Sequence, residues 1–99
     1  MGRLERVPGK QNWIENLSPA TRAAWHRSWI YRAAVKIHEE KGRPIHQAIP
    51  FAVNAAKKGC ATGDLNWNGP QSVNPKSRAE MCAAVALWNK MRAESKGKG

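Results

Sequence analysis

The side chains in this sequence that could bind a soft metal ion are three histidines and two cysteines, namely His26, His38, His46, Cys60 and Cys82. Zinc sites usually place ligands in tight pairs, such as C-x-x-C or two histidines on one turn of a helix. No pair among these five residues has such a spacing. We therefore expect no metal site and no cofactor, with the histidines at the surface or at helix ends.

The sequence also has few residues that could serve in acid–base or nucleophilic catalysis. The chain has 7 Asp and Glu residues in all. Glu39 and Glu40 are adjacent, so their side chains diverge on a helix. Asp64 lies among turn-forming residues, where its carboxylate can accept hydrogen bonds from its own backbone. A nucleophile elbow, a glycine-rich phosphate loop and a Ser-His-Asp arrangement are all missing from the sequence. We therefore expect a protein that is not an enzyme and has no small-molecule substrate.

The cationic residues indicate binding instead. Lys and Arg number 17, which gives a formal net charge of +10. Such an excess repels itself in a compact protein, and an acidic partner surface or a nucleic-acid phosphate backbone would relieve the repulsion. Two tryptophans outside the long helical patterns could add aromatic contacts. The residues that we predict to contact a partner are Arg3, Arg6, Trp13, Arg22, Arg27, Arg32, Trp67, Lys90 and Arg92.

The elements that position these side chains must fit into 99 residues, which is enough for one small domain. The helical spacing of apolar residues predicts an all-α fold, a small three-helix domain with a long loop between its last two helices. We assign residues 1–11 to a basic N-terminal arm, 12–93 to the helical domain and 94–99 to a basic C-terminal tail. The predicted core residues are Trp25, Trp29, Ile30, Ile37, Val53, Val85 and Trp88.

The first long helix is expected to follow a short helical turn at 12–17. Ser18 can accept a backbone hydrogen bond as N-cap, and Pro19 suits the first helical position. The helix should run without a break to about Lys41, where Gly42 can adopt the left-handed conformation that ends a helix.

The second and third helices are less sharply bounded. The second should begin at Arg43-Pro44 and end at Gly59, and Pro50 either kinks it or divides it from a preceding turn; we favour one kinked segment. The third should begin at Asn74-Pro75 or at the capping box of residues 77–80, and it should reach about Ala93.

The loop is expected to span residues 60–73, CATGDLNWNGPQSV. It contains several turn-forming residues, and Leu65, Trp67 and Val73 could anchor it to the core. Among the tryptophans, however, Trp67 is the least committed to the core and the best candidate for a contact outside the domain. We expect the thiols of Cys60 and Cys82 to be free and buried, as in a protein of the reducing cytoplasm. A disulfide between them is the alternative outside the cytoplasm, because one ends a helix and the other faces inward. The sequence shows no signal peptide and no membrane-spanning run.

A family resemblance covers most of the chain. Residues 48–91 contain A-I-P-F-A-V-N, K-K-G-C-A-T-G-D, V-N, S-R-A-E and C-A-A-V-A, and residues 10–14 read K-Q-N-W-I. These segments resemble a small domain of actinobacterial tailed phages, found in small head proteins and as an appendage of capsid or head-maturation proteins. The sequence departs from that pattern at Pro50 and in residues 18–36, which are unusually rich in Trp and Arg.

The resemblance implies a virion protein that is made in the host bacterial cytoplasm and assembles on the head shell. We therefore expect a non-enzymatic minor capsid or decoration protein, whose partner is the major capsid protein or another head protein. One alternative is a basic nucleic-acid-binding protein that contacts packaged DNA or regulates transcription. Another is a scaffolding or maturation-associated module that is lost from the mature particle.

Overall fold

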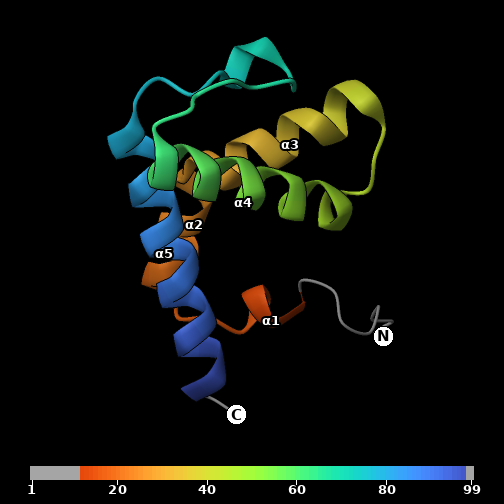
Figure 1. Ribbon diagram of the computed structural model, residues 1–99. Helices are drawn as coiled ribbons and strands as arrows, with labels where there is room; N and C mark the ends of the chain where they lie inside the picture. The colour runs from red at the N-terminus through yellow and green to blue at the C-terminus, as the bar shows by residue number, and fades with distance from the viewer. Residues whose placement is uncertain (1–11, 98–99) are drawn as a thin grey trace.

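A computed structural model of the chain describes residues 12–97, and every regular element in that range is helical (Figure 1). The expected all-α fold class is confirmed. The expected count of three helices is not, because α2 to α5 are four helices of nine residues or more. In chain order the elements are α1 (Asn12–Glu15), α2 (Pro19–Arg27), α3 (Trp29–Lys41), α4 (Ile45–Thr62), the 3-10 turn η1 (Gln71–Val73) and α5 (Arg78–Gly97).

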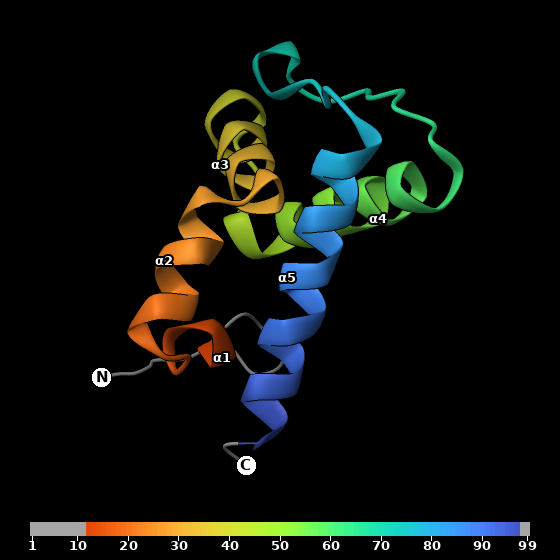
Figure 2. The ribbon, with the colours of Figure 1, turned by 90° about the vertical axis from the view of Figure 1, so that its left-hand side faces the viewer.

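The helices pack around α4 and α5. Helices α3 and α4 lie side by side and run in opposite directions, joined by a tight turn in which Gly42 is left-handed, with φ 71° (Figure 1). Helix α5 packs across α4 and extends toward α1 and α2, which pack against its second half (Figure 2). The loop of residues 63–77 returns over α3, and η1 packs on that helix. None of the described helices is both long enough and apolar enough to cross a membrane.

The expected single helix from Pro19 to Lys41 is wrong, because Ser28 divides it. Ser28 has an extended backbone, with φ −73° and ψ 155°, and it ends α2 and begins α3. Its hydroxyl donates to the Trp25 carbonyl at 2.7 Å and accepts from the Tyr31 amide at 3.2 Å. A serine hydroxyl can replace helical backbone hydrogen bonds in this way. The break sends Trp25 and Trp29 to different parts of the core.

Helix α4 is a single segment, as we favoured, and it is longer than expected. It passes through Pro50, which is exposed, as one continuous helix, so this proline does not divide the segment. It also passes through Gly59 and ends at Thr62, where Gly63 is left-handed with φ 78°. The expected end at Gly59 is therefore wrong, and the loop begins three residues later than predicted.

Gly59 serves the packing of α4 against α5. It is buried, and a Cβ atom at this position would lie 2.6 Å from Cγ of Met81 and 3.2 Å from its Cβ. Met81 is fully buried on the facing side of α5. Because a real Cβ cannot approach so closely, the two helices keep this separation only with glycine here.

The close approach of these helices brings the two cysteines together. Cys60 and Cys82 form a disulfide, with their Cα atoms 4.6 Å apart. Our expectation of free thiols is therefore wrong. The alternative pairing holds instead, because Cys60 follows Gly59 on α4 and Cys82 follows Met81 on α5. The bond encloses the loop of residues 63–77.

Helix α5 begins as the capping box predicts but ends later than expected. The Ser77 hydroxyl accepts from the Glu80 amide at 3.1 Å, and the Glu80 carboxylate accepts from the Lys76 amide at 3.0 Å. The predicted end at Ala93 is too early, since the helix runs to Gly97. Within this extension, Glu94 accepts hydrogen bonds from the Ser18 amide and the Thr21 hydroxyl, both at 2.7 Å. A carboxylate from α5 thus caps the start of α2.

Aromatic side chains form two clusters in the core. The first aromatic cluster joins α1, α2, α3 and α5 and consists of Trp13, Trp25, Tyr31 and Trp88, with successive ring centroids 5.4–5.8 Å apart. The second aromatic cluster joins α3, α4 and the loop and consists of Trp29, Trp67 and Phe51, with centroids 5.0 Å and 5.5 Å apart. Of the predicted core, Val85 is only partly buried, and Trp25, Trp29, Ile30, Ile37, Val53 and Trp88 are buried.

Candidate functional site

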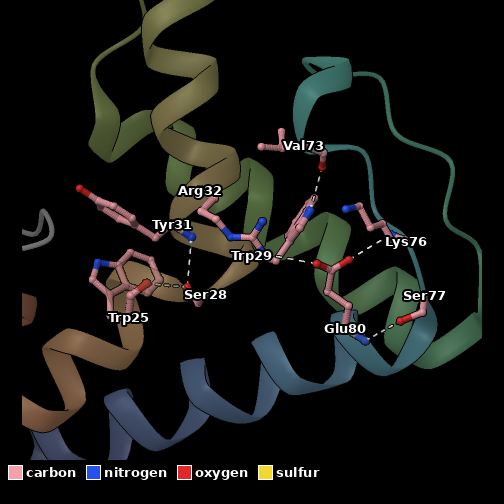
Figure 3. Close-up of polar contacts among 9 residues, drawn as sticks. All are labelled: Trp25, Ser28, Trp29, Tyr31, Arg32, Val73, Lys76, Ser77 and Glu80. Atoms are coloured by element: carbon pink, nitrogen blue, oxygen red, sulfur yellow. Dashed lines mark hydrogen bonds and ion pairs between the residues drawn. The ribbon is translucent and has the colours of Figure 1, made fainter.

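The arginines predicted to contact a partner have different surroundings. Arg3 and Arg6 lie outside the described residues. Arg22 is partly buried, and its Nε is buried without a hydrogen-bond partner. Arg32 pairs with the Glu80 carboxylate of α5 at 3.3 Å (Figure 3). Arg92 stands 5.7 Å from the ring centroid of Trp13, a cation–π distance.

Two predicted cations, Arg27 and Lys90, are exposed and have no ion pair within residues 12–97. Arg27 lines a hollow of about 260 Å³ between α2, α3 and α5, together with Arg32 and Glu80. Because Glu80 already neutralises Arg32 and accepts from the Lys76 amide, this hollow has one free positive charge (Figure 3). Lys90 does not line it. The predicted cations are therefore not gathered into one site.

Trp67 is not the exposed contact that its place in a loop suggested. Its side chain is 7% exposed, and its ring packs between Trp29 and Phe51. Its indole N–H donates to the Pro70 carbonyl at 2.8 Å. A Cβ at Gly69 would collide with this ring, so the loop backbone itself covers it. The prediction of a free Trp67 is corrected: the loop folds back and inserts this side chain into the core.

Trp13 also packs inward. Its ring lies against Trp88, at 5.4 Å between centroids, and Arg92 covers it from α5. It remains partly exposed. Helix α1 therefore docks on α5 through Trp13, which leaves this residue only a limited surface for an outside partner.

A groove with binding character lies elsewhere, at the turn between α3 and α4. It has a volume of about 410 Å³, and its walls come from the end of α3, the first half of α4 and the tip of the loop. Its lining combines apolar, amide and cationic groups. The lining residues are Ile37, Lys41, Arg43, Gln47, Ala48, Phe51, Asn68 and Gly69. We call it the α3–α4 groove.

The α3–α4 groove is positively charged. Lys41 and Arg43 are exposed on either side of Gly42, and neither forms an ion pair within the described part of the chain. The carbonyl of Arg43 lies 2.6 Å from Nδ1 of His38, and this contact ties the turn to α3. Among residues 12–97, no acidic side chain lines the groove. The field inside it therefore favours a negatively charged group.

The aromatic wall of the groove is Phe51. It is 49% exposed, and it is the exposed large hydrophobic residue among those described. Trp67 supports its ring from the core side. The sequence patterns did not single out Phe51, Lys41 and Arg43 as contact residues. A signal for Phe51 was available in the sequence. This large aromatic residue follows Pro50 and lies beside the apolar stripe of α4, not within it, which predicts an exposed ring.

Metal ligands and the titratable residue Asp64 were considered at the sequence level as further candidates. Within residues 12–97, no three His, Cys, Asp or Glu side chains gather as metal ligands would. Asp64, just after α4, accepts from the Asn66 amide at 2.9 Å and pairs with Lys58 at 3.2 Å. The hydrogen bond from Asn66, aided by Lys58, lowers the pKa of the Asp64 carboxyl. Asp64 therefore acts locally as a turn-stabilising residue.

Comparisons with known proteins add no further assignment. No protein-family model, no curated protein and no solved structure matches this chain. The function must therefore be argued from the residues and from the groove.

Proposed function

We propose that this chain is a non-enzymatic phage virion protein, a minor capsid or decoration protein that is made in the bacterial cytoplasm and binds the head shell. The observation that carries the proposal is the excess of exposed cations without an acidic partner in residues 12–97, among them Arg27, Lys41, Arg43 and Lys90. The resemblance in residues 10–14 and 48–91 supplies the partner, the major capsid protein or another head protein.

The resembling segments support the proposal through the fold that they build. The C-A-T-G-D segment contains the disulfide residue Cys60, the left-handed Gly63 and the turn residue Asp64. The S-R-A-E segment forms the capping box of α5. These segments hold the scaffold, whereas Arg27, Lys41 and Arg43 lie outside residues 10–14 and 48–91. A scaffold like that of the phage domain, combined with a cationic surface particular to this chain, would suit a protein that binds one particular head shell.

Electrostatic attraction would govern how the protein meets the shell. Cations at the surface speed association with an acidic surface and orient it, and salt weakens the effect. We expect the purified protein to co-sediment with empty head shells at physiological salt and to be released as the salt concentration rises. A protein that stays in the supernatant at every salt concentration would contradict the proposal.

Nucleic-acid binding is the second candidate, and one observation favours it. An exposed aromatic ring that shares a groove with cations, as Phe51 does with Lys41 and Arg43, can stack on a base. A gel shift with single-stranded and duplex DNA tests this function. Binding that weakens steeply with salt, from a protein that does not co-sediment with shells, would replace the first proposal by the second.

A further inference from the structure

We infer that the α3–α4 groove binds an acidic segment of a partner protein. One apolar side chain of the segment packs against Phe51, and its carboxylates pair with Lys41 and Arg43. The inference rests on the proposed function only for the identity of the protein that carries the segment.

The exposed ring of Phe51 supplies the apolar contact for the segment. The Phe51 ring is held in place before any ligand binds. Its centroid lies 5.5 Å from that of the Trp67 ring, and the Trp67 ring lies 5.0 Å from that of Trp29. The indole of Trp29 is fixed in turn by a hydrogen bond to the Val73 carbonyl at 2.8 Å (Figure 3). A supported aromatic residue loses little conformational freedom on binding, which favours its use as an anchor.

The size of the groove limits what can enter. A volume of about 410 Å³ is at the small end of ligand sites. It admits one large side chain and part of its backbone, and it is too small for a whole helix. The buried side chains of Ile37 and Ala48 close its apolar floor.

Lys41 and Arg43 supply the charged contacts for the segment. Both are exposed and unpaired within the described chain, and they flank one glycine. An arginine guanidinium binds a carboxylate with two parallel hydrogen bonds, and a lysine adds a point charge. Carboxylates on either side of an apolar residue would meet both cations.

The amides at the rim suit a peptide backbone. Gln47 and Asn68 are exposed, line the groove and form no side-chain hydrogen bond within residues 12–97. Each amide offers both a donor and an acceptor, which is what an extended segment requires.

Charge complementarity selects the occupant. Residues 1–11 of this chain carry Arg3, Arg6 and Lys10 against Glu5, and a second copy carries a net charge of +10, so neither matches the cations of the groove. A nucleic-acid strand is best followed by a continuous row of cations. The two cations that line this groove, Lys41 and Arg43, belong to one turn, and its other described lining residues are uncharged.

The test is a titration of the full-length protein with a blocked fluorescent peptide that has one phenylalanine flanked by glutamates. We expect saturable binding, read by fluorescence anisotropy. Phe51→Ala should weaken binding about tenfold, as loss of a central anchor does. Arg43→Glu should weaken it by at least as much, because it also repels the glutamates.

Matched controls separate the groove from the overall charge. Lys57→Glu changes the same charge on the exposed side of α4, away from the groove, and should leave the affinity within about twofold. A peptide with glutamine in place of glutamate, and one with serine in place of phenylalanine, should each bind more weakly. Circular dichroism of each variant verifies that the helices are retained.

The outcomes are distinct from those of the shell experiment. Peptide binding that Phe51→Ala and Arg43→Glu weaken and Lys57→Glu does not supports the groove, whether or not shells bind the protein. No peptide binding, or equal loss from Arg43→Glu and Lys57→Glu, overturns it. Oligothymidylate that binds in a Phe51-dependent way, in the absence of peptide binding, also overturns it and assigns the groove to nucleic acid.

Discussion

The two aromatic clusters are built from similar residues and end differently. The first, around Trp25 and Trp88, is closed by α1 and by Arg92, which lies over Trp13. The second runs from buried Trp29 through Trp67 to Phe51, which is half exposed at the α3–α4 groove. The first cluster is part of the core. The second cluster connects the core to the surface, where its buried tryptophans hold the exposed Phe51 ring in place.

The difference shows how a small domain can combine stability with recognition. A protein of this size has little apolar surface to spare, and an exposed aromatic ring reduces what is buried. Such a ring is useful for binding when it is held rigidly. The tryptophans behind Phe51 supply that support, and the disulfide beside the loop maintains the loop that carries Trp67.

The largest expected effect comes from removing the base of the second cluster. Trp29→Ala creates a cavity and leaves the Val73 carbonyl without its donor, so the free energy of unfolding should fall by about 3–5 kcal/mol. Urea denaturation measures this loss. A loss below about 1 kcal/mol would show that the cluster does not support the fold.

Removing the disulfide should affect the two clusters unequally. The bond closes a sequence separation of 22 residues, and a loop of that size corresponds to about 3 kcal/mol of stability. With Cys60 and Cys82 both replaced by serine, hydrogen exchange should rise more in residues 63–77 than in α2. Equal rises in the two regions would contradict a separate role for the second cluster.

The first cluster depends on the cap that α5 gives to α2. Thr21→Val keeps the shape of a buried side chain and removes the hydroxyl donor to Glu94. Hydrogen bonds to charged groups contribute about 2 kcal/mol, so thermal denaturation should show a loss near that size. Thr62→Val is the control, because that hydroxyl is exposed and its two partners, the Lys58 carbonyl and the Asp64 amide, are neutral.

A smaller effect is expected where α4 meets α5. Gly59→Ala gains about 1 kcal/mol of helix propensity, but its methyl group would overlap Met81 at a cost of about 1–3 kcal/mol. We expect a net destabilisation near 1 kcal/mol in urea. The double variant with Met81→Ala should recover part of the penalty in a mutant cycle. Simple additivity of the two changes would refute the proposed contact.

The smallest effect concerns the turn that begins the loop. The pKa of Asp64 is lowered in the folded state, so its carboxylate stabilises the fold above its unfolded pKa of 3.8, and this contribution is lost as the pH falls through the folded pKa. Asp64→Asn should therefore reduce the stability slightly at neutral pH and flatten its decline in acid. An unchanged acid limb in urea titrations would contradict this assignment.

Local signals in the sequence predicted the helical fold well. Ser18-Pro19, Gly42 and the capping box of residues 77–80 act within one turn of chain, so their effects can be recognised from neighbouring residues. Ser28 and Gly59 could not be assigned in this way. Whether a serine hydroxyl breaks a helix depends on the packing beyond it, and the role of Gly59 depends on Met81, which follows 22 positions later.

The residues of the α3–α4 groove were not predicted from the sequence. Composition indicated an unbalanced cationic surface, and Arg27 and Lys90, which lie outside the groove, have no ion pair in the described structure. The sequence could not reveal that Arg32 is neutralised by Glu80, because 48 positions separate them. For Trp67 the sequence left open a core anchor or a partner contact, and we chose the contact because the residue lies in a loop. That loop folds onto α3, so Trp67 is buried and Phe51 is the large hydrophobic residue that is exposed in residues 12–97.

The covalent ring closed by Cys60 and Cys82 has a consequence for proteolysis. A protease that cleaves the chain once between these residues leaves two fragments that remain joined, and α4 and α5 can stay packed. The fragments would separate on a denaturing gel only after reduction. A protein with this ring can thus survive a nick in its longest loop, where an uncrosslinked helical domain would lose its last helix.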